Sequence, residues 1–281
     1  MSTASLPTKP VLVPGGRASW LTLGAVLFTA LWLLPVVLIA LSALSTKAQI
    51  LSWPKSFFAT DAYTLDTLKY FIGFAGVWPA LLNSVKVASL TMVMATLLGA
   101  PAGYALARYL FRGDQLYRLI IVMTRAFPLA ILALPLITRF IEWGIYDTVF
   151  GVAVVHTALA LPFAILVTSS LFMGIPRELE EAALTLGCSS LGAFARIVVP
   201  LALPGIVATM IFSFVISWNE VFAATLLTLH ERTLTAFLFT TLEEAPLHFR
   251  FAGAFLMIVP PIVFIFLVRK YLFSMWGISN R

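Results

Sequence analysis

Residues 176–201 read PRELEEAALTLGCSSLGAFARIVVPL, and this stretch decides the fold. Pro176 suits the first position of a helix, where its missing N–H is not needed. Acidic residues follow in the early turns, where the helix dipole favours anions: Glu178, Glu180 and Glu181. Apolar residues then recur at the i, i+3, i+4, i+7 spacing of an amphipathic helix: Leu179, Ala182, Ala183 and Leu186. Gly187 is placed to end this helix in a left-handed conformation.

A second short helix is predicted after the glycine. Ser189 or Ser190 can cap it. Its apolar stripe consists of Leu191, Phe194, Ile197, Val198 and Leu201. Pro200 and Pro204 then turn the chain into the next apolar run. Two amphipathic helices joined at a glycine form either a connector that lies on the membrane surface or a docking element, and the periodicity alone leaves both interpretations open.

Both flanks of this stretch are apolar. Between Asp147 and Arg177 only His156 can ionise, and between Arg196 and Glu231 the only formal charge is Glu220. Of the 281 residues, 61% are hydrophobic and 11% are charged, whereas a soluble domain carries about 25% charged residues. The mean hydropathy is +1.01. We therefore expect a lipid bilayer, rather than water, to solvate most of the chain.

The apolar runs are long enough to cross a membrane as helices, because about 20 residues span the roughly 30 Å hydrocarbon layer. This predicts an all-α polytopic membrane protein with six transmembrane helices. The predicted helices are 20–44, about 83–107, 119–140, 149–173, 206–229 and 251–272. The first run is too long for the apolar core of a secretion signal and is predicted to remain as an anchor. The segment 174–203 connects the fourth and fifth helices.

Lys and Arg are more frequent on one side of the predicted membrane, which the positive-inside rule makes cytoplasmic. That side holds, among others, Arg108, Arg112, Arg177 and Arg196. Both chain ends are then cytoplasmic tails, at 1–19 and 274–281, and residues 45–80 form an extracytoplasmic segment. The remaining transmembrane core covers residues 81–273.

Several classes of function are disfavoured. The net charge of +6 is scattered between apolar runs, so no nucleic-acid surface is expected. The single cysteine, Cys188, excludes an intrachain disulfide and a thiolate metal cluster. No G-x-x-x-x-G-K-[ST] phosphate loop occurs, so ATP is not hydrolysed here by that route. An intramembrane enzyme would need a nucleophile with its base or clustered metal ligands, and the sequence indicates neither. The main alternative is a stand-alone carrier or channel. It would show inverted repeats or matching broken spans, and the sequence does not indicate these.

The spacing within residues 181–200 resembles a known signature. Glu181-Ala182-Ala183, three residues, Gly187, nine residues and Ile197-Val198-Val199-Pro200 resemble the EAA motif of binding-protein-dependent ABC importer permeases. The usual form is EAA, three residues, Gly, nine residues and I-x-L-P, so Val199 replaces a leucine. Shorter segments look like the carbohydrate branch, maltose-type and MalG-like: Asn83-Ser84, Gly103-Tyr104-Ala105-Leu106-Ala107-Arg108, Leu161-Pro162-Phe163-Ala164, Ile175-Pro176-Arg177-Glu178-Leu179 and Trp218-Asn219-Glu220.

The resemblance implies a coupling helix that docks on a separate ATPase. The residues it implicates are Glu178, Glu181, Ala182, Ala183, Gly187, Ile197 and Pro200. It also implies three kinds of protein partner: a second, MalF-like permease subunit, a dimer of ATP-binding subunits that holds ATP and Mg, and an extracytoplasmic solute-binding protein. The chain itself would bind no cofactor. It would carry a sugar, polyol or related solute by alternating access, in the cytoplasmic (inner) membrane of a prokaryote.

Polar residues inside the predicted spans are candidates for the translocation path, because ionisable groups there usually face a bundle interior or a cavity. The candidates in the outer half are Asn83, Lys86, His156, Asn219 and Glu220. From their depth, Lys86 is predicted to pair with Glu220. We expect these residues to line an outer vestibule or its gate, and the alternative is a bridge between helices without substrate contact.

Overall fold

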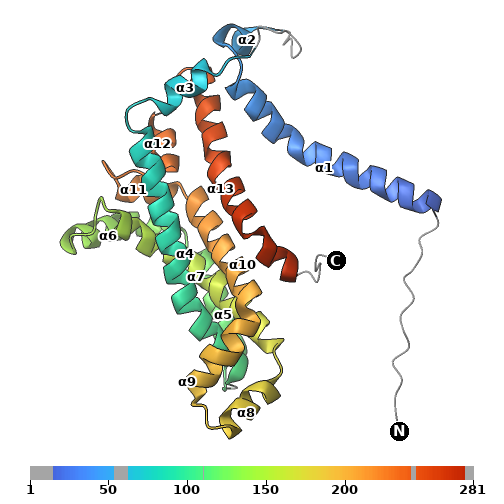
Figure 1. The fold of residues 1–281 in the computed structure, drawn as a ribbon. Helices are drawn as coiled ribbons and strands as arrows, with labels where there is room; N and C mark the ends of the chain where they lie inside the picture. Colours follow the sequence, from blue (N-terminus) through green and yellow to red (C-terminus); the bar gives the residue numbers. More distant parts are fainter. Residues whose placement is uncertain (1–14, 54–62, 110, 242–244, 276–281) are drawn as a thin grey trace.

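The computed structural model describes residues 15–53, 63–109, 111–241 and 245–275, and these fold almost entirely into helices (Figure 1). The first elements are α1 (Gly15–Ala43), α2 (Lys47–Leu51), α3 (Asp66–Ile72), α4 (Val77–Arg108), α5 (Asp114–Met123), η1 (Thr124–Ala126) and α6 (Leu129–Glu142). The next are α7 (Val149–Met173), α8 (Arg177–Thr185), α9 (Ser190–Ala193), η2 (Phe194–Val198), α10 (Val199–Asn219), α11 (Phe222–Leu227), α12 (Leu234–Thr241) and α13 (Leu247–Met275). Parts of the predicted tails and of the segment 45–80 lie outside the described residues.

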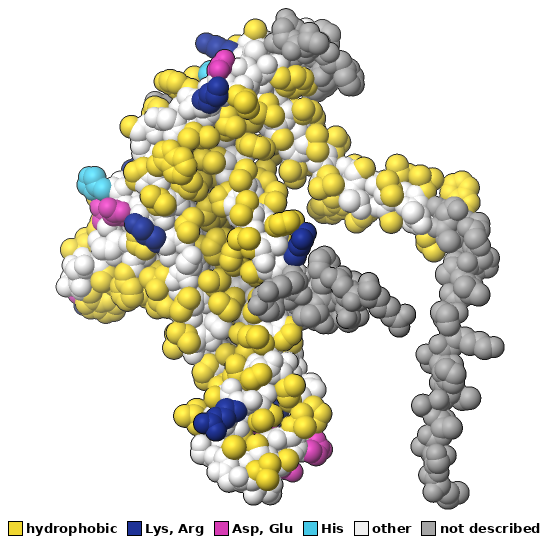
Figure 2. All heavy atoms as spheres, viewed as in Figure 1, with side chains coloured by type: hydrophobic (Ala, Val, Ile, Leu, Met, Phe, Trp, Pro, Cys, Tyr) yellow, Lys and Arg dark blue, Asp and Glu magenta, His cyan; other side chains and the backbone are white. Residues whose placement is uncertain are grey.

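Five helical segments are long and apolar enough to cross a membrane, and a bent pair makes a sixth if it is one span. The five are Trp20–Ala43, Val77–Arg108, Val149–Met173, Ser190–Asn219 and Leu247–Arg269. The all-helical membrane fold predicted from the apolar runs is therefore confirmed. Figure 2 shows broad apolar surfaces along the flanks of the bundle, with charged side chains in a few patches.

The third predicted span, 119–140, is not one straight helix. Asp114–Ala126 and Leu129–Glu142 are separate segments that meet at an angle of 82°. The break falls at Phe127, whose backbone is extended (φ −75°, ψ 119°) and which precedes Pro128. A proline ring disfavours the helical conformation of the residue before it and removes a backbone donor, and both effects favour a break at this position.

The fifth predicted span, 206–229, has different ends. The helix begins at Ser190, passes through the π-helical turn η2 and stops at Asn219. It stops because Glu220 is extended (φ −76°, ψ 127°) and its carboxylate accepts hydrogen bonds from Ala223 N and Ala224 N, at 3.0 and 3.2 Å, which starts α11. Near the other end, Pro200 lies in the first turn of α10, directly after the π-helical turn η2.

The centre of the molecule is formed by α4, α7 and α10, which pack side by side. Small residues allow α4 and α7 to approach closely: a Cβ added at Gly103 would lie 2.1 Å from Thr168 Oγ1, and one at Gly99 2.7 Å from Ala164 Cβ. Thr168 Oγ1 also donates to Gly99 O at 3.1 Å. Gly99 and Gly103 are four residues apart, the spacing with which small residues bring membrane helices together.

The helix α1 lies apart from this bundle. It contacts α13 near its end and then extends away from it (Figure 1). Its large apolar side chains, such as Trp20, Leu27 and Trp32, are exposed. An apolar helix of this length with most of its large side chains exposed indicates contact with lipid or with another membrane subunit.

Candidate functional site

The helix α8 begins at Arg177, with Pro176 as the residue before it (φ −56°, ψ 133°). Pro176 therefore occupies the N-cap rather than the first helical position predicted for it. Glu178 and Glu180 lie in the first turn, where the helix dipole favours negative charge. The sequence thus places the start of α8 correctly to within one residue.

Gly187 ends α8 in the predicted left-handed conformation, with φ +90°. Gly187 N donates to Leu184 O and Cys188 N donates to Ala183 O, both at 3.0 Å. These two bonds satisfy carbonyls at the end of the helix in the manner of a Schellman motif. A Cβ at residue 187 would meet nothing within 4 Å, so only the backbone conformation calls for glycine.

The two faces of α8 differ in exposure. Glu178, Glu181 and Ala182 are exposed, and Leu186 is 86% exposed. Ala183, which was predicted to share the apolar stripe with Ala182, is buried. The surface formed by Glu178, Glu181, Ala182 and Leu186 is therefore free in this chain, and we call it the outer face of α8.

The predicted second helix is not a separate unit. Ser189 caps it by accepting a hydrogen bond from Gly192 N at 3.1 Å. It then continues without a break through η2 into α10. The predicted stripe fails at both ends, because Leu191 is 75% exposed and Leu201 is 52% exposed. Ile197 is half-buried and Pro200 is exposed.

Glu180 is a site residue that sequence reasoning did not single out. It is buried, and its carboxylate accepts hydrogen bonds from Arg108 Nε and from the Tyr104 hydroxyl, the latter at 2.6 Å. Glu180 lies three residues after Arg177, on the side of α8 opposite to its outer face. The sequence shows that residue 180 is acidic. Which of Glu178, Glu180 and Glu181 is buried depends on the rotation of α8 about its axis.

A second polar cluster lies near the other end of the bundle and centres on His156, which is fully buried in α7. His156 Nε2 lies 2.9 Å from Glu220 Oε2, and Nδ1 lies 2.8 Å from Ser217 Oγ. Ser217 in turn donates to Thr91 Oγ1 at 3.3 Å. The cluster joins α4, α7, α10 and the start of α11.

The predicted pairing of Lys86 with Glu220 is wrong. Glu220 is paired with His156, whereas Lys86 is an exposed residue of α4. The prediction used depth along the spans, whereas the pairing also depends on rotation about each helix axis. The next two residues of α4, Val87 and Ala88, are buried, so Lys86 lies outside the buried face of the helix.

The remaining predicted path residues are held in different ways. Asn83 Nδ2 donates to Glu231 Oε2 at 2.9 Å and to Arg232 O at 3.4 Å. Asn219 is exposed, and its Nδ2 donates to Val215 O at 3.0 Å. Among the described residues, the structure therefore brings His156 and Glu220 together but not the whole predicted set.

Asp147 fixes the loop that follows α11. It has φ +56°, and its carboxylate accepts hydrogen bonds from Leu229 N, His230 N and Glu231 N at 2.8 to 3.2 Å. His230 Nδ1 lies 2.9 Å from the same carboxylate. Burial alone would raise the pKa of Asp147, but these hydrogen bonds outweigh burial and lower the pKa to about 2.

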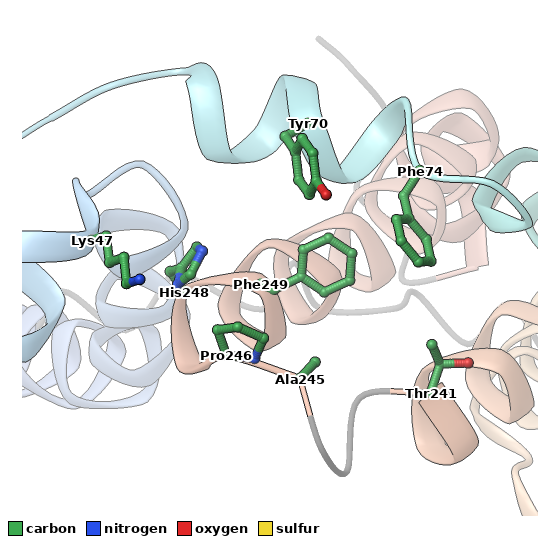
Figure 3. A pocket seen from close by; sticks show the side chains of 8 residues that line it. All are labelled: Lys47, Tyr70, Phe74, Thr241, Ala245, Pro246, His248 and Phe249. Carbon is green, nitrogen blue, oxygen red and sulfur yellow. The ribbon is translucent and has the colours of Figure 1, made fainter.

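A cavity of about 440 Å³ lies between α2, α3 and the start of α13. Figure 3 shows the side chains that line it: Lys47, Tyr70, Phe74, Thr241, Ala245, Pro246, His248 and Phe249. It contains none of the predicted site residues. Within the described part of the chain, no group of three or more His, Cys, Asp or Glu residues is placed to hold a metal ion.

Comparison with known proteins places these features in a family. A family model described as the binding-protein-dependent transport system inner membrane component matches residues 95–274. The matched region includes α8, Gly187, His156 and Glu220, and it begins after Asn83 and Lys86.

Individual relatives agree with this match. The trehalose transport system permease protein SugB of Mycobacterium tuberculosis (strain CDC 1551 / Oshkosh) is 35% identical over 197 residues, which cover 68% of this chain and 72% of that protein. The diacetylchitobiose uptake system permease protein NgcG of Streptomyces coelicolor (strain ATCC BAA-471 / A3(2) / M145) is 30% identical over 195 residues, covering 69% of this chain and 64% of that protein.

The fold is also similar to a solved structure. A crystal structure of a bacterial ABC transporter involved in the import of the acidic polysaccharide alginate contains a chain that matches with a TM-score of 0.73 at 20% identity, covering 94% of this chain and 100% of that chain. Since the family model covers most of the chain, including the EAA segment, the chain belongs to the binding-protein-dependent transport system inner membrane components, the multi-pass permease subunits of ABC importers.

Proposed function

We propose that this chain is one of two permease subunits of an ATP-driven importer that carries a sugar, polyol or related small solute. ATP and Mg²⁺ are bound by a dimer of partner ATPase subunits, and a solute-binding protein delivers the solute from outside. The observation that carries the proposal is the outer face of α8, which stands free at the end of a bundle that belongs to the importer family.

The end of the bundle that holds α8 and α9 is the cytoplasmic end in this proposal. Arg108, Arg177 and Arg196 lie there, as the positive-inside rule requires. Because α4 and α7 both end at this side, α1 enters the membrane from the cytoplasm and α13 returns to it. Both chain ends are then cytoplasmic.

The outer face of α8 supplies the surface that docks on the ATPase. Ala182 and Leu186 form an exposed apolar ridge, and Glu181 adds a carboxylate that can pair with a basic residue of the partner. The Gly187 cap fixes the direction in which the chain leaves this ridge. Ala183 packs inward and supports the helix rather than the partner.

The solute is a carbohydrate or a related polyol. Support comes from the relatives, whose names state trehalose transport and diacetylchitobiose uptake, and from the alginate importer with a similar fold. Each of these solutes is built from sugar units and presents many hydroxyl groups.

Lys86 and Asn219 face the space between the two permease subunits. Both are exposed in the single chain, and an ammonium group such as that of Lys86 is costly in lipid, so a water-filled path is the favourable environment for it. Asn83, His156 and Glu220 are hydrogen-bonded within the chain and brace the outer half of that path.

A photo-crosslinking amino acid at Ala182, in the complete importer, tests the docking surface. We expect a covalent adduct with the ATP-binding subunit. The same group at Leu97, which is 68% exposed on the flank of α4, serves as the control and should give none. Adducts absent at residue 182, or uptake of labelled trehalose that persists in cells carrying Glu181→Lys with normal membrane insertion, would contradict the proposal.

A further inference from the structure

The inner side of α8 is fastened to the end of α4 by a buried ion pair. Arg108, the last residue of α4, pairs with Glu180, and the two side chains are only 8% and 10% exposed. The second oxygen of the Glu180 carboxylate accepts a hydrogen bond from the hydroxyl of Tyr104, one turn earlier in α4, at 2.6 Å. Both oxygens are thus occupied, so the carboxylate is held in one orientation.

The same arginine also holds the end of α7. Arg108 Nη1 donates to Phe172 O at 2.8 Å, and Nη2 donates to Ile175 O at 3.1 Å. These carbonyls belong to the last turn of α7 and the residues after it, where backbone acceptors lack helical partners and a positive charge is favoured. One guanidinium group therefore connects three elements, which its fork of donors permits and a lysine ammonium does not.

A second arginine links the start of α8 to the end of α4. Arg177, the first residue of α8, donates through Nη2 to Ala107 O at 3.3 Å and to Arg108 O at 3.1 Å, the last carbonyls of α4. Arg177 and Glu180 are three residues apart and share one face of α8. Each helix end is thus capped by an arginine from another element: α7 by Arg108 and α4 by Arg177.

An aromatic layer lies beside these polar contacts. The ring centroid of Tyr104 is 5.7 Å from that of Phe172 in α7 and 4.5 Å from that of Phe194 in η2. Phe172 is fully buried. The segment after Gly187 is therefore packed on the same ends of α4 and α7 as α8 itself.

We propose that Arg108, Glu180 and Arg177 form a clamp that makes α8 move as one body with the inner ends of α4 and α7. They are positioning residues, which transmit displacement of α8 to the two central spans: Arg108 and Glu180 are buried, and Arg177 is exposed at the start of α8. This inference rests on the proposed function of the outer face of α8. The clamp and the docking surface lie on opposite sides of one helix, so substitutions can separate them.

The geometry explains why both sides of α8 are needed. A docking surface attached only through the flexible residues around it would absorb the motion of the ATPase locally. The buried pair instead joins α8 to two helices that cross the whole membrane and contact each other along their length. Packed helices move as rigid bodies because their interfaces do not deform continuously.

The test measures solute transport per ATP hydrolysed in the reconstituted importer for Glu180→Gln and Arg108→Lys. Arg108→Lys keeps the charge but cannot reach the carboxylate and both carbonyls together. We expect transport per ATP to fall about 2- to 30-fold, the range for residues that carry coupling between sites, while the crosslink from residue 182 to the ATPase and ATP hydrolysis persist. Glu142→Gln, which removes an exposed partner of Arg139, is the charge-matched control and should change nothing.

The outcomes separate the two proposals. If the protein that carries the photo-crosslinking group at residue 182 and an unchanged clamp gives no crosslink, the docking proposal fails. If it gives the crosslink but Glu180→Gln and Arg108→Lys leave transport per ATP unchanged, the clamp is overturned. The clamp is also overturned if both variants lose the crosslink and the assembled complex together with transport, because these residues would then only stabilise the fold.

Discussion

His156 Nε2 lies 2.9 Å from Glu220 Oε2, and the histidine ring has no exposed surface. Glu220 follows the last residue of α10, and its carboxylate also receives the first free N–H groups of α11. One carboxylate thus holds α7 against the point where the fifth span breaks.

The pairing of His156 with Glu220 predicts a non-additive loss of stability. Glu220→Ala leaves the buried Nε2 of His156 and two N–H groups of α11 without their partner, so it destabilises strongly. Once Glu220 is gone, His156→Ala should cost less than it does in the wild type, with a coupling energy of about 0.5–3 kcal/mol. Unfolding of the purified permease in mixed micelles measures the cycle.

Lys86→Ala serves as the comparison, because Lys86 lies on the exposed side of α4. We expect its effect to add to that of Glu220→Ala. Coupling between Lys86 and Glu220, together with additivity for His156, would reverse the assignment of the ion pair.

The close approach of α4 and α7 at Gly103 predicts that glycine-to-alanine substitution destabilises the protein there but not at Gly24. In Gly103→Ala the new Cβ meets Thr168 Oγ1 at 2.1 Å and the backbone of Ile165 and Ser169 at 2.8 Å, so α4 and α7 must move apart. We expect a loss of about 1–3 kcal/mol or more. Gly24→Ala, in the exposed helix α1, meets nothing within 4 Å and should be neutral or slightly stabilising. The thermal unfolding midpoints of the two variants, measured in the same detergent, test this prediction. Equal shifts of the midpoint in both variants would contradict it.

The spans could be predicted from sequence because the length of an apolar run is a property of the chain alone. The break at Pro128 shows where this reasoning stops. Pro101 and Pro162 remain inside continuous helices, whereas Pro128 separates α5 from α6. All three carry the same local penalty, and Pro101 is exposed whereas Pro162 is buried, so neither the proline itself nor its burial tells which helix breaks.

The site was predictable to the level of the helix but not of its rotation. The acidic residues at the start of α8 and the glycine at its end follow from capping rules. Which carboxylate points inward does not, because Glu178, Glu180 and Glu181 have the same chemistry and differ only in angle about the axis. The partner of Glu220 was predicted wrongly for the same reason. The position of a residue along a span follows from the sequence, but the residue that faces it on another helix depends on the rotation of both helices about their axes.

The left-handed conformation of Gly187 predicts a purely conformational effect of substitution. A side chain at φ +90° costs about 1–2 kcal/mol, and nothing nearby would clash with it. In Gly187→Ala the amides of Gly187 and Cys188, which close the end of α8, should exchange about 5- to 30-fold faster with solvent. Gly187→Asn is the matched variant, because asparagine tolerates this conformation better, and its effect should be smaller. Hydrogen exchange with mass spectrometry measures both, and an unchanged rate in Gly187→Ala would count against the cap.

The Asp147 carboxylate predicts how the outer loop depends on pH. Its pKa is lowered to about 2 in the folded protein from an ordinary value of 3.8, because it accepts hydrogen bonds from Leu229, His230 and Glu231 while it is ionised. The unfolded chain therefore binds a proton at Asp147 before the folded chain does. The contribution of this group to stability is complete above pH 4 and is lost as the pH falls toward 2.

Asp147→Asn isolates this contribution, because asparagine also adopts φ +56° and leaves the backbone undisturbed. At pH 7 the variant should unfold at a lower temperature than the wild type, since a neutral amide oxygen accepts these N–H bonds more weakly than a carboxylate does. The difference should shrink steadily between pH 4 and pH 2, because the wild-type carboxyl becomes protonated in that interval and approaches the neutral form of the variant. Groups that do not contact residue 147 titrate alike in both proteins, so thermal midpoints compared pair by pair cancel their effect. A difference that stays constant from pH 7 down to pH 2 would mean that the charge of Asp147 does not hold the loop.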